Sequence, residues 1–361
     1  MITTQTPLRI SFAGGGSDLP SFYRQFGGAV VSTAIDKFVY INVNQKFDDW
    51  IRLSYSRTEE VATVEEIDHR IVRAGLKKLG FTGGIEITSI ADIPSSGTGL
   101  GSSSAFTVGL LLALHAYQSR YISAGDLADE SCAVEIDLCG ERIGKQDQYA
   151  AAFGGLNFIR FEPDERVIVE PILCSGSELE QLESQLITFY TGKTRAASSI
   201  LAEQSAQAES NQTTQNLLRR MTKLAYELRD ELNAGHIEAL GAVLDEGWRL
   251  KREVHPRVSD GAIDDWYAAA KRAGAVGGKL LGAGGGGFLT FFAPPERHPE
   301  IEKALGLRRI GVSLESSGSR VLLYHRPRYH DSRYLKTATA TPKVGIMTRR
   351  ALSSAVRAVD S

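Results

Sequence analysis

A glycine- and serine-rich segment, PSSGTGLGSSSA at residues 94–105, carries the residues best suited to chemistry. Its alternating glycines allow positive φ angles and a close backbone approach to a ligand. A predicted apolar helix at 102–117 follows, and its free N–H groups and positive dipole end face the loop. This combination predicts a cradle for a polyphosphate. We expect the following residues to form it: Pro94, Gly97, Gly99, Leu100, Gly101, Ser102, Ser103 and Ser104.

The cradle differs from two common nucleotide-binding loops. No Gly-Lys-Ser/Thr closes it, so it is no Walker A motif, and its glycine spacing does not fit the dinucleotide pattern GxGxxG. The simpler interpretation is a Gly/Ser linker in which Ser102 is an ordinary helix N-cap.

Two further glycine runs lie near the ends of the chain. Residues 277–288, GGKLLGAGGGGF, contain four consecutive glycines. Such a run is costly in backbone entropy, so it predicts a second phosphate-facing loop, or a tight turn at a domain contact. Residues 7–18, PLRISFAGGGSD, place Arg9 on a predicted strand and Asp18 on the loop after it. Alone, this third pattern is weak, because an exposed arginine and a loop aspartate are common.

The elements that must position these residues alternate between strand and helix signals. The first half contains β-branched and aromatic segments, and a helix after Asp126 carries Glu135. The polar stretch 162–185 predicts a surface crossing at a domain boundary. The second half begins with a strand at 186–191, continues with long helices between 196 and 273, and ends with a strand at 321–325 that we expect to close its domain. The order predicts an α+β fold, with domains at 1–170 and 171–335 and a basic tail at 336–361.

Taken together, the three glycine segments resemble the GHMP kinase superfamily, whose phosphate loop PxxxGLGSS fits residues 94–103 without a gap. Within that superfamily the phrases PLRISFAGGGSDLP, GKQDQYAAAFGG and FYTGKTR are similar to those of D-glycero-D-manno-heptose 7-phosphate kinases. The resemblance implies a two-domain α+β fold. Its N-terminal domain would be like domain 2 of ribosomal protein S5, its C-terminal domain would be ferredoxin-like, and ATP would lie between them.

The resemblance also implies roles for individual residues. Asp147 would be the catalytic aspartate that orients or deprotonates the attacking hydroxyl, and Arg9 would offset charge beside it. Glu135 would bind Mg²⁺ together with a serine of the loop, Ser103 being the choice over Ser102. The residues expected at the substrate are Asp18, Gly15, Gly16 and Gly285.

Two cations after the strand at 186–191, Lys193 and Arg195, could clamp a substrate phosphate, the arginine with two hydrogen bonds. A solvated basic turn is the equal alternative. Lys145 is a further candidate for charge stabilisation.

The implied reaction is transfer of the γ-phosphoryl group of ATP, with Mg²⁺, to the anomeric hydroxyl of the heptose 7-phosphate. The product, the 1,7-bisphosphate, would lead toward nucleotide-activated heptose. Alternatives are a kinase for a sugar of the fucose, galactose or mannose type, a nucleotide- and sugar-binding sensor without turnover, and an ATP-dependent decarboxylase.

Composition limits the partners. A net charge of −2 provides no overall basic field for nucleic acid or anionic lipid. The N-terminal residues MITTQTPLRIS contain no basic segment followed by an apolar run, so no signal peptide is expected. The sparse cysteines, Cys132, Cys139 and Cys174, suit a reducing compartment. With the need for ATP, these features predict a cytoplasmic protein; the oligomeric state stays open, with a homodimer as one option.

Overall fold

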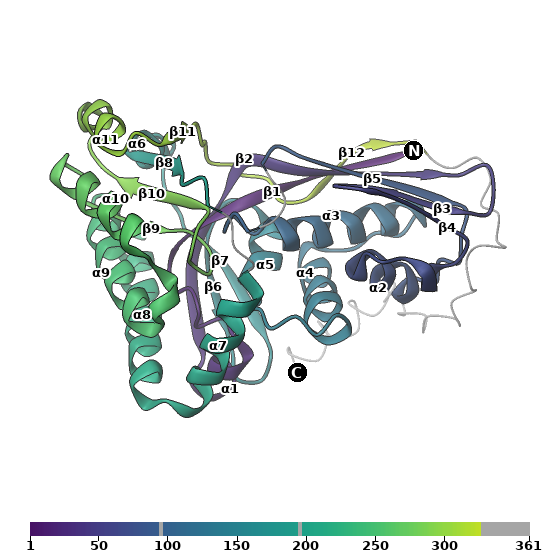
Figure 1. The fold of residues 1–361 in the computed structure, drawn as a ribbon, viewed down its shortest axis with the longest axis horizontal. Helices are drawn as coiled ribbons and strands as arrows, with labels where there is room; N and C mark the ends of the chain where they lie inside the picture. The colour runs from purple at the N-terminus through teal and green to yellow at the C-terminus, as the bar shows by residue number, and fades with distance from the viewer. Residues whose placement is uncertain (94–96, 194–196, 326–361) are drawn as a thin grey trace, which may run out of the picture.

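The computed structural model describes residues 1–93, 97–193 and 197–325, and two bodies, each built on its own β-sheet, lie side by side in it (Figure 1). The strands of the first body are β1 (Ile2–Ala13), β2 (Gly28–Gln45), β3 (Ile51–Ser54), β4 (Thr58–Val61), β5 (Ile85–Ala91), β6 (Leu156–Phe161), β7 (Val167–Pro171) and β12 (Arg320–Tyr324). Its helices are α1 (Pro20–Phe26), the 3₁₀ turn η1 (Val64–Glu66), α2 (Arg70–Lys78), α3 (Ser102–Tyr117), α4 (Ala124–Cys132), the π-helical turn η2 (Ala133–Leu138) and α5 (Gln146–Phe153).

The second body follows β7. It contains α6 (Gly176–Ser184), β8 (Leu186–Tyr190), α7 (Ala197–Ser210), α8 (Gln212–Asn233), α9 (Ala239–Val254), the 3₁₀ turn η3 (Pro256–Val258), α10 (Gly261–Arg272), β9 (Gly277–Leu280), β10 (Phe288–Phe292), the 3₁₀ turn η4 (Pro295–Arg297), α11 (His298–Leu305) and β11 (Arg308–Ile310). Its four strands form an antiparallel sheet in the order β11-β8-β10-β9. No helix of the described residues is both long and apolar enough to cross a membrane.

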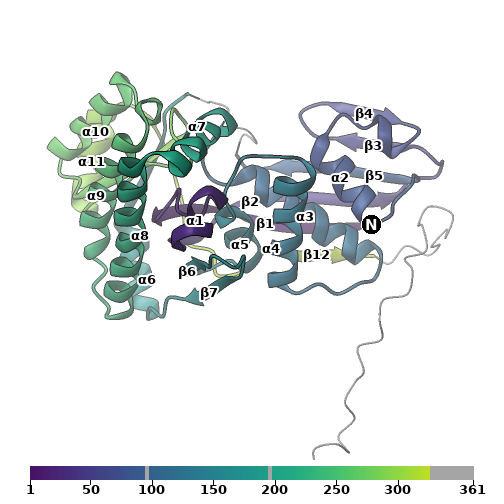
Figure 2. The ribbon, with the colours of Figure 1, turned by 90° about the horizontal axis from the view of Figure 1, so that it is seen from below.

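The long strand β2 holds the first body together. It pairs with β1 over most of its length, with β5 through Val39–Gln45 and with β6 through Gly28–Thr33. The β1–β2 register shifts between Pro7 and Leu8, where proline lacks an N–H to donate. The two-stranded ribbon formed by β1 and β2 extends from the sheet covered by α2–α5 toward the second body, as Figures 1 and 2 show. It carries Arg9 and the glycines after β1 into the region between the bodies.

Helix α3 is buried along most of its length and packs on β1 and β2. Its sequence is apolar on all sides, which is typical of a helix enclosed by other elements. Gly109 permits the close contact with β1, because a Cβ there would lie 2.6 Å from Thr6 Oγ1. Thr4 Oγ1 donates to the carbonyl of Gly109 at 2.9 Å. These contacts hold the middle of α3 against β1. Gly101, with a φ of 76°, precedes the first residue of the helix.

The last strand corrects one prediction. The segment 321–325 was expected to close the second domain, but β12 pairs antiparallel with β1 and joins the first sheet. Its β-branched and aromatic residues identify a strand, whereas the partner is set by the free edge of β1, which no sequence pattern reveals. The division at 170 and 171 remains a proposal, and the basic tail at 336–361 lies outside the described residues.

Close backbone contacts between the bodies require glycine at three positions, two of which belong to the run at 277–288. A Cβ at Gly99 would overlap the carbonyl group of Leu281, one at Gly282 would overlap the backbone of Gly99, and one at Gly287 would overlap the carbonyl of Thr98. All three glycines have positive φ angles. The loop at 97–101 therefore packs backbone against backbone on the loop at 281–287, as only glycine permits.

We expect Gly99→Ala to be clearly more destabilising than Gly306→Ala. Both positions have positive φ, 78° and 60°, but nothing lies within 4 Å of a Cβ at Gly306. Gly306→Ala should cost the left-handed strain alone, about 1–2 kcal/mol. Gly99→Ala adds overlap with a backbone that cannot rotate away, about 1–3 kcal/mol more. Urea unfolding midpoints of the two variants measure the difference, and equal losses would contradict the loop contact.

Candidate active site

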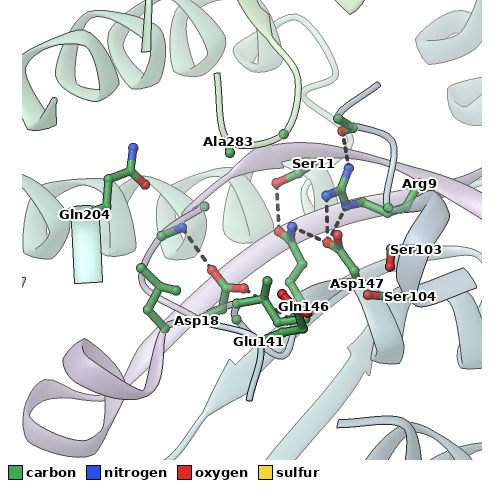
Figure 3. A pocket seen from close by; sticks show the side chains of 18 of the residues that line it. Arg9, Ser11, Asp18, Ser103, Ser104, Glu141, Gln146, Asp147, Gln204 and Ala283 are labelled. Atoms are coloured by element: carbon green, nitrogen blue, oxygen red, sulfur yellow. Dashed lines mark hydrogen bonds and ion pairs between the residues drawn. The ribbon is translucent and has the colours of Figure 1, made fainter. Parts of the chain in front are cut away.

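A cavity of about 400 Å³ lies between the two bodies. Its lining comes from β1, the 97–104 loop and the start of α5 in the first body, and from α8, α9 and the 279–283 segment in the second. Figure 3 shows Gln204 and Ala283 across the cavity from the cluster of polar side chains. The volume suits a small-molecule site.

An ion pair between Arg9 and Asp147 lies at the centre of this cluster. Arg9 Nε and Nη2 lie 2.8 and 2.7 Å from Asp147 Oδ1, and Nη1 donates to the carbonyl of Gly99 at 2.6 Å (Figure 3). The arginine side chain is 5% exposed and the aspartate 27%. Arg9 thus ties the carboxylate of α5 to the glycine loop, and leaves the carboxylate partly open to the cavity.

A second contact fixes the orientation of that carboxylate. Gln146 Nε2 donates to Asp147 Oδ1 at 3.1 Å, and Ser11 Oγ donates to Gln146 Oε1 at 2.8 Å. The donors from Arg9 and Gln146 all meet Oδ1, and among the described residues no hydrogen bond is formed to Oδ2. The second oxygen is therefore available to accept a hydrogen bond or a proton from a ligand.

Asp18 is a buried carboxylate on the loop after β1. Its Oδ1 accepts from the Gly16 N–H at 2.9 Å, and its Oδ2 from the Gln146 N–H at 3.3 Å. The absence of a side chain at Gly144 is required, because a Cβ there would overlap the Asp18 carboxylate. Burial, with a smaller contribution from the charge of Asp147, raises the pKa of Asp18. Asp18 lines the cavity together with the predicted Gly15 and Gly16.

Glu135 lies on the π-helical turn that follows α4, a form of helix often found at functional sites. Ser103 Oγ donates to its Oε1 at 3.3 Å and Gln148 Nε2 to its Oε2 at 2.6 Å. The residue is 1% exposed, and burial raises its pKa to about 7, although hydrogen bonds from Ser104, Gln148 and Thr107 oppose the shift. No cation pairs with it among the described residues.

Glu135 and Ser103 fit a magnesium ion that takes most of its ligands from phosphate and water. A buried carboxylate with no cationic partner and an adjacent hydroxyl are hard oxygen donors of the kind Mg²⁺ prefers. In the described part of the chain no group of three or more His, Cys, Asp or Glu side chains could hold a metal ion alone. The donor set therefore suits an ion that arrives with a phosphate.

The structure places the remaining predicted residues as follows. The cavity is lined by Gly97, Gly99, Gly101, Ser102, Ser103 and Ser104. Leu100 is buried behind the loop, where its carbonyl accepts from the Arg9 N–H at 3.0 Å. Lys145 pairs with Glu165 at 2.7 Å. Pro94 and Arg195 lie outside the described residues.

Two predicted substrate residues do not reach the cavity. The Gly285 N–H donates to the Val258 carbonyl at 2.9 Å, so Gly285 shapes the loop. Lys193 Nζ pairs with Asp260 at 2.6 Å and lies over the ring of Trp266. An aspartate within reach satisfies this lysine locally, so it is held away from the cavity.

Two lysines that sequence reasoning missed do line the cavity, Lys251 of α9 and Lys279 of β9. Lys251 follows Leu244 and Trp248 at helical spacing, so it falls on the buried stripe of an amphipathic helix. A lysine on a buried helical stripe is a signal from which the sequence alone could have indicated a functional cation. Lys279 stands inside the glycine run, where its spacing to other residues predicts nothing.

An anion cradle that faces an arginine-bound aspartate is what phosphoryl transfer to a hydroxyl requires, so the cavity defines a kinase. Family models agree: residues 67–155 match the GHMP kinases N terminal domain and residues 228–307 match GHMP kinases C terminal. The chain therefore has the two-domain α+β fold of GHMP kinases predicted from the sequence, and it is a sugar kinase.

Similar proteins include sugar kinases of several kinds. A D-glycero-alpha-D-manno-heptose 7-phosphate kinase of Campylobacter jejuni is 29% identical over 320 residues, which cover 84% of this chain and 93% of that one. A bifunctional fucokinase/GDP-fucose pyrophosphorylase of Arabidopsis thaliana is 27% identical over 333 residues, 30% of its length. The crystal structure of a D-glycero-D-manno-heptose 1-phosphate kinase of Bacteroides thetaiotaomicron shares the fold, with a TM-score of 0.75, 24% identity and coverage of 90% of this chain and 100% of that one.

We expect Glu135→Gln to change how stability depends on pH in metal-free protein. The folded-state pKa of about 7 exceeds the ordinary 4.5, so the folded protein binds more protons between these values and loses stability as pH rises. From pH 5.5 to 8 the wild type should lose about 2 kcal/mol that the variant keeps. Urea unfolding in EDTA at several pH values measures the difference.

Glu165→Gln is the control for this measurement. The pKa of Glu165 is lowered to about 2, with hydrogen bonds from Lys145, Tyr23 and Arg24 outweighing its burial. Its stabilising contribution is therefore lost only as pH falls below about 4.5, and the difference between this variant and wild type should stay flat from pH 5.5 to 8. A flat difference for Glu135→Gln as well would show that Glu135 is not a costly buried carboxylate.

Proposed function

We propose that this chain transfers the γ-phosphoryl group of ATP to the anomeric hydroxyl of D-glycero-D-manno-heptose 7-phosphate and forms the 1,7-bisphosphate. The observation that carries the proposal is the Arg9–Asp147 pair, which holds one carboxylate oxygen and leaves the other open beside the glycine loop. The similarity to a heptose 7-phosphate kinase along most of both chains supports the choice of acceptor. Dependence on ATP supports a cytoplasmic location.

The donor end of the cavity is the loop at 97–104. Its positive-φ glycines and the N–H groups at the start of α3 would hold the ATP phosphates. Glu135 and Ser103 would hold Mg²⁺, which neutralises phosphate charge when it is bound. The ionised form of Glu135 is the one that binds a cation, and the ion would repay the desolvation that raises its pKa.

The acceptor end of the cavity lies between Asp147 and Asp18. Asp147 Oδ2 would receive the proton of the attacking hydroxyl, and the anomeric hydroxyl is acidic enough for a carboxylate base. Arg9 holds the Asp147 carboxylate in position, and its charge would offset negative charge near the transferred group. Asp18, fixed by two backbone N–H groups, would accept hydrogen bonds from the other sugar hydroxyls.

A kinase for an unphosphorylated sugar is the second candidate. The similarity to a fucokinase supports it, and so does the position of Lys193, which the Asp260 ion pair holds away from the cavity. The two candidates share the donor site and the base, so they differ only in what contacts the far end of the acceptor.

We expect ADP release with Mg-ATP and heptose 7-phosphate, and a loss of about 10²–10⁴-fold in kcat for Asp147→Asn, because the amide cannot take up the proton. A coupled assay should compare heptose 7-phosphate, mannose 6-phosphate, mannose, fucose and galactose. Asp164→Asn is the matched control, since Asp164 is an exposed aspartate paired with Arg166. It should retain full activity.

Each pattern of turnover decides between the candidates. Turnover confined to the heptose phosphate and lost in Asp147→Asn supports the proposal. Preference for a free sugar, with the same loss, supports the second candidate. Unchanged turnover in Asp147→Asn would remove Asp147 as the base whatever the acceptor.

A further inference from the structure

The second body contributes two buried lysines to the cavity, Lys251 and Lys279, for which the chemistry above has no role. They are 9% and 6% exposed. Lys251 Nζ donates to the Gly282 carbonyl, and Lys279 Nζ donates to the Phe12 carbonyl at 3.2 Å. An ammonium group carries three donors. Each lysine therefore keeps donors for a ligand, and neither forms an ion pair with a described carboxylate.

Keeping these lysines in the cavity is electrostatically costly. Burial, together with the positive charge of Arg9, lowers the pKa of Lys251 to about 8. Burial, followed by the positive charges of Lys251 and Arg9, lowers the pKa of Lys279 well below its ordinary value. Buried charges are normally paired, so such a cluster calls for an anion from outside.

A phosphate group fits this cluster better than other anions do. It has a double negative charge and several acceptor oxygens, which match two ammonium groups that each retain free donors. Two phosphates enter the reaction as proposed, one on the donor and one on the acceptor. The donor has the loop at 97–104 and the start of α3 in the proposed reaction, whereas Lys193, the other described lysine considered for the acceptor's phosphate, is paired with Asp260.

The surroundings of Lys251 also indicate the acceptor end of the cavity. Among the described residues, the charge of the Asp18 carboxylate favours the protonated form of Lys251. Asp18 is also the residue proposed to contact the sugar hydroxyls. Resting on the proposed function, we infer that Lys251 and Lys279 form a phosphate subsite that binds the phosphate of the acceptor sugar and selects phosphorylated over free sugars.

Lys251→Met and Lys279→Met test the subsite, because methionine keeps much of the length and removes the charge. At saturating Mg-ATP each variant should lower kcat/KM for heptose 7-phosphate by about 10–100-fold, the range expected for losing a charged hydrogen bond. The value for unphosphorylated heptose should stay within about 3-fold, and the KM for ATP should not change. Lys223→Met, an exposed lysine of α8 that pairs with Glu227, is the matched control.

Two results would overturn the inference. Equal losses for both acceptors with a raised KM for ATP would show that the lysines contact the donor's phosphates. Loss of preference for the phosphorylated acceptor in Lys193→Met, with none in the two cavity variants, would place the clamp at Lys193.

A binding measurement separates this inference from the proposed reaction. With the loop filled by Mg-AMPPNP, inorganic phosphate should raise the thermal unfolding midpoint of wild type and Lys223→Met but not of Lys251→Met or Lys279→Met. The midpoints without phosphate report whether the variants fold. If wild type phosphorylates no heptose, the proposed function fails, while a phosphate response that depends on the lysines still supports the subsite. A response equal in all four proteins overturns it.

Discussion

The guanidinium of Arg9 is the contact on which the site depends, because it binds the Asp147 carboxylate and the Gly99 carbonyl at the same time. Its own position is set by the pairing of β1 with β2 and by the hydrogen bond from its N–H to Leu100. A strand, a loop and a helix thus meet at one side chain. In the proposed reaction, such an arrangement would hold the base beside the acceptor hydroxyl with little rearrangement, and positioning is a main requirement of phosphoryl transfer.

The same loop explains how the two bodies share one cavity. Backbone contact between the loops at 97–101 and 281–287 leaves no room for side chains, so close approach rests on glycines with positive φ at both surfaces. Within the second body, the ammonium group of Lys251 contacts the Gly282 carbonyl of the 281–287 loop. The donor loop of the first body is therefore held by the second, and the lysines of the second body are brought to face the carboxylates of the first.

Local signals in the sequence predicted local structure well. Helix α3 has the expected bounds, since glycines precede it and its apolar run is unbroken. Longer-range features were harder to predict. The β-branched and aromatic segments at 29–34 and 38–44, which Ile35, Asp36 and Lys37 separate, form one strand, β2. The polar stretch expected to cross the surface contains β7 and α6. Strand β9, within the glycine run, carries a lysine that only its burial reveals. The gathering of Arg9, Asp18, Glu135 and Asp147 came from the family resemblance, because no spacing relates residues so far apart.

Buried carboxylates of the first body and buried lysines of the second body line the same cavity. Glu135 and Asp18 are carboxylates of the first body whose burial favours their neutral forms, and Lys251 and Lys279 are cations of the second body whose burial does the same. Direct pairing would cancel these charges but would close the cavity. Among the described residues these carboxylates and lysines form no ion pair with one another. In the proposals above, Glu135 would meet a metal ion and the two lysines would meet a phosphate. Binding of both would restore the charged forms, so the energy lost to burial in the free protein favours the ternary complex.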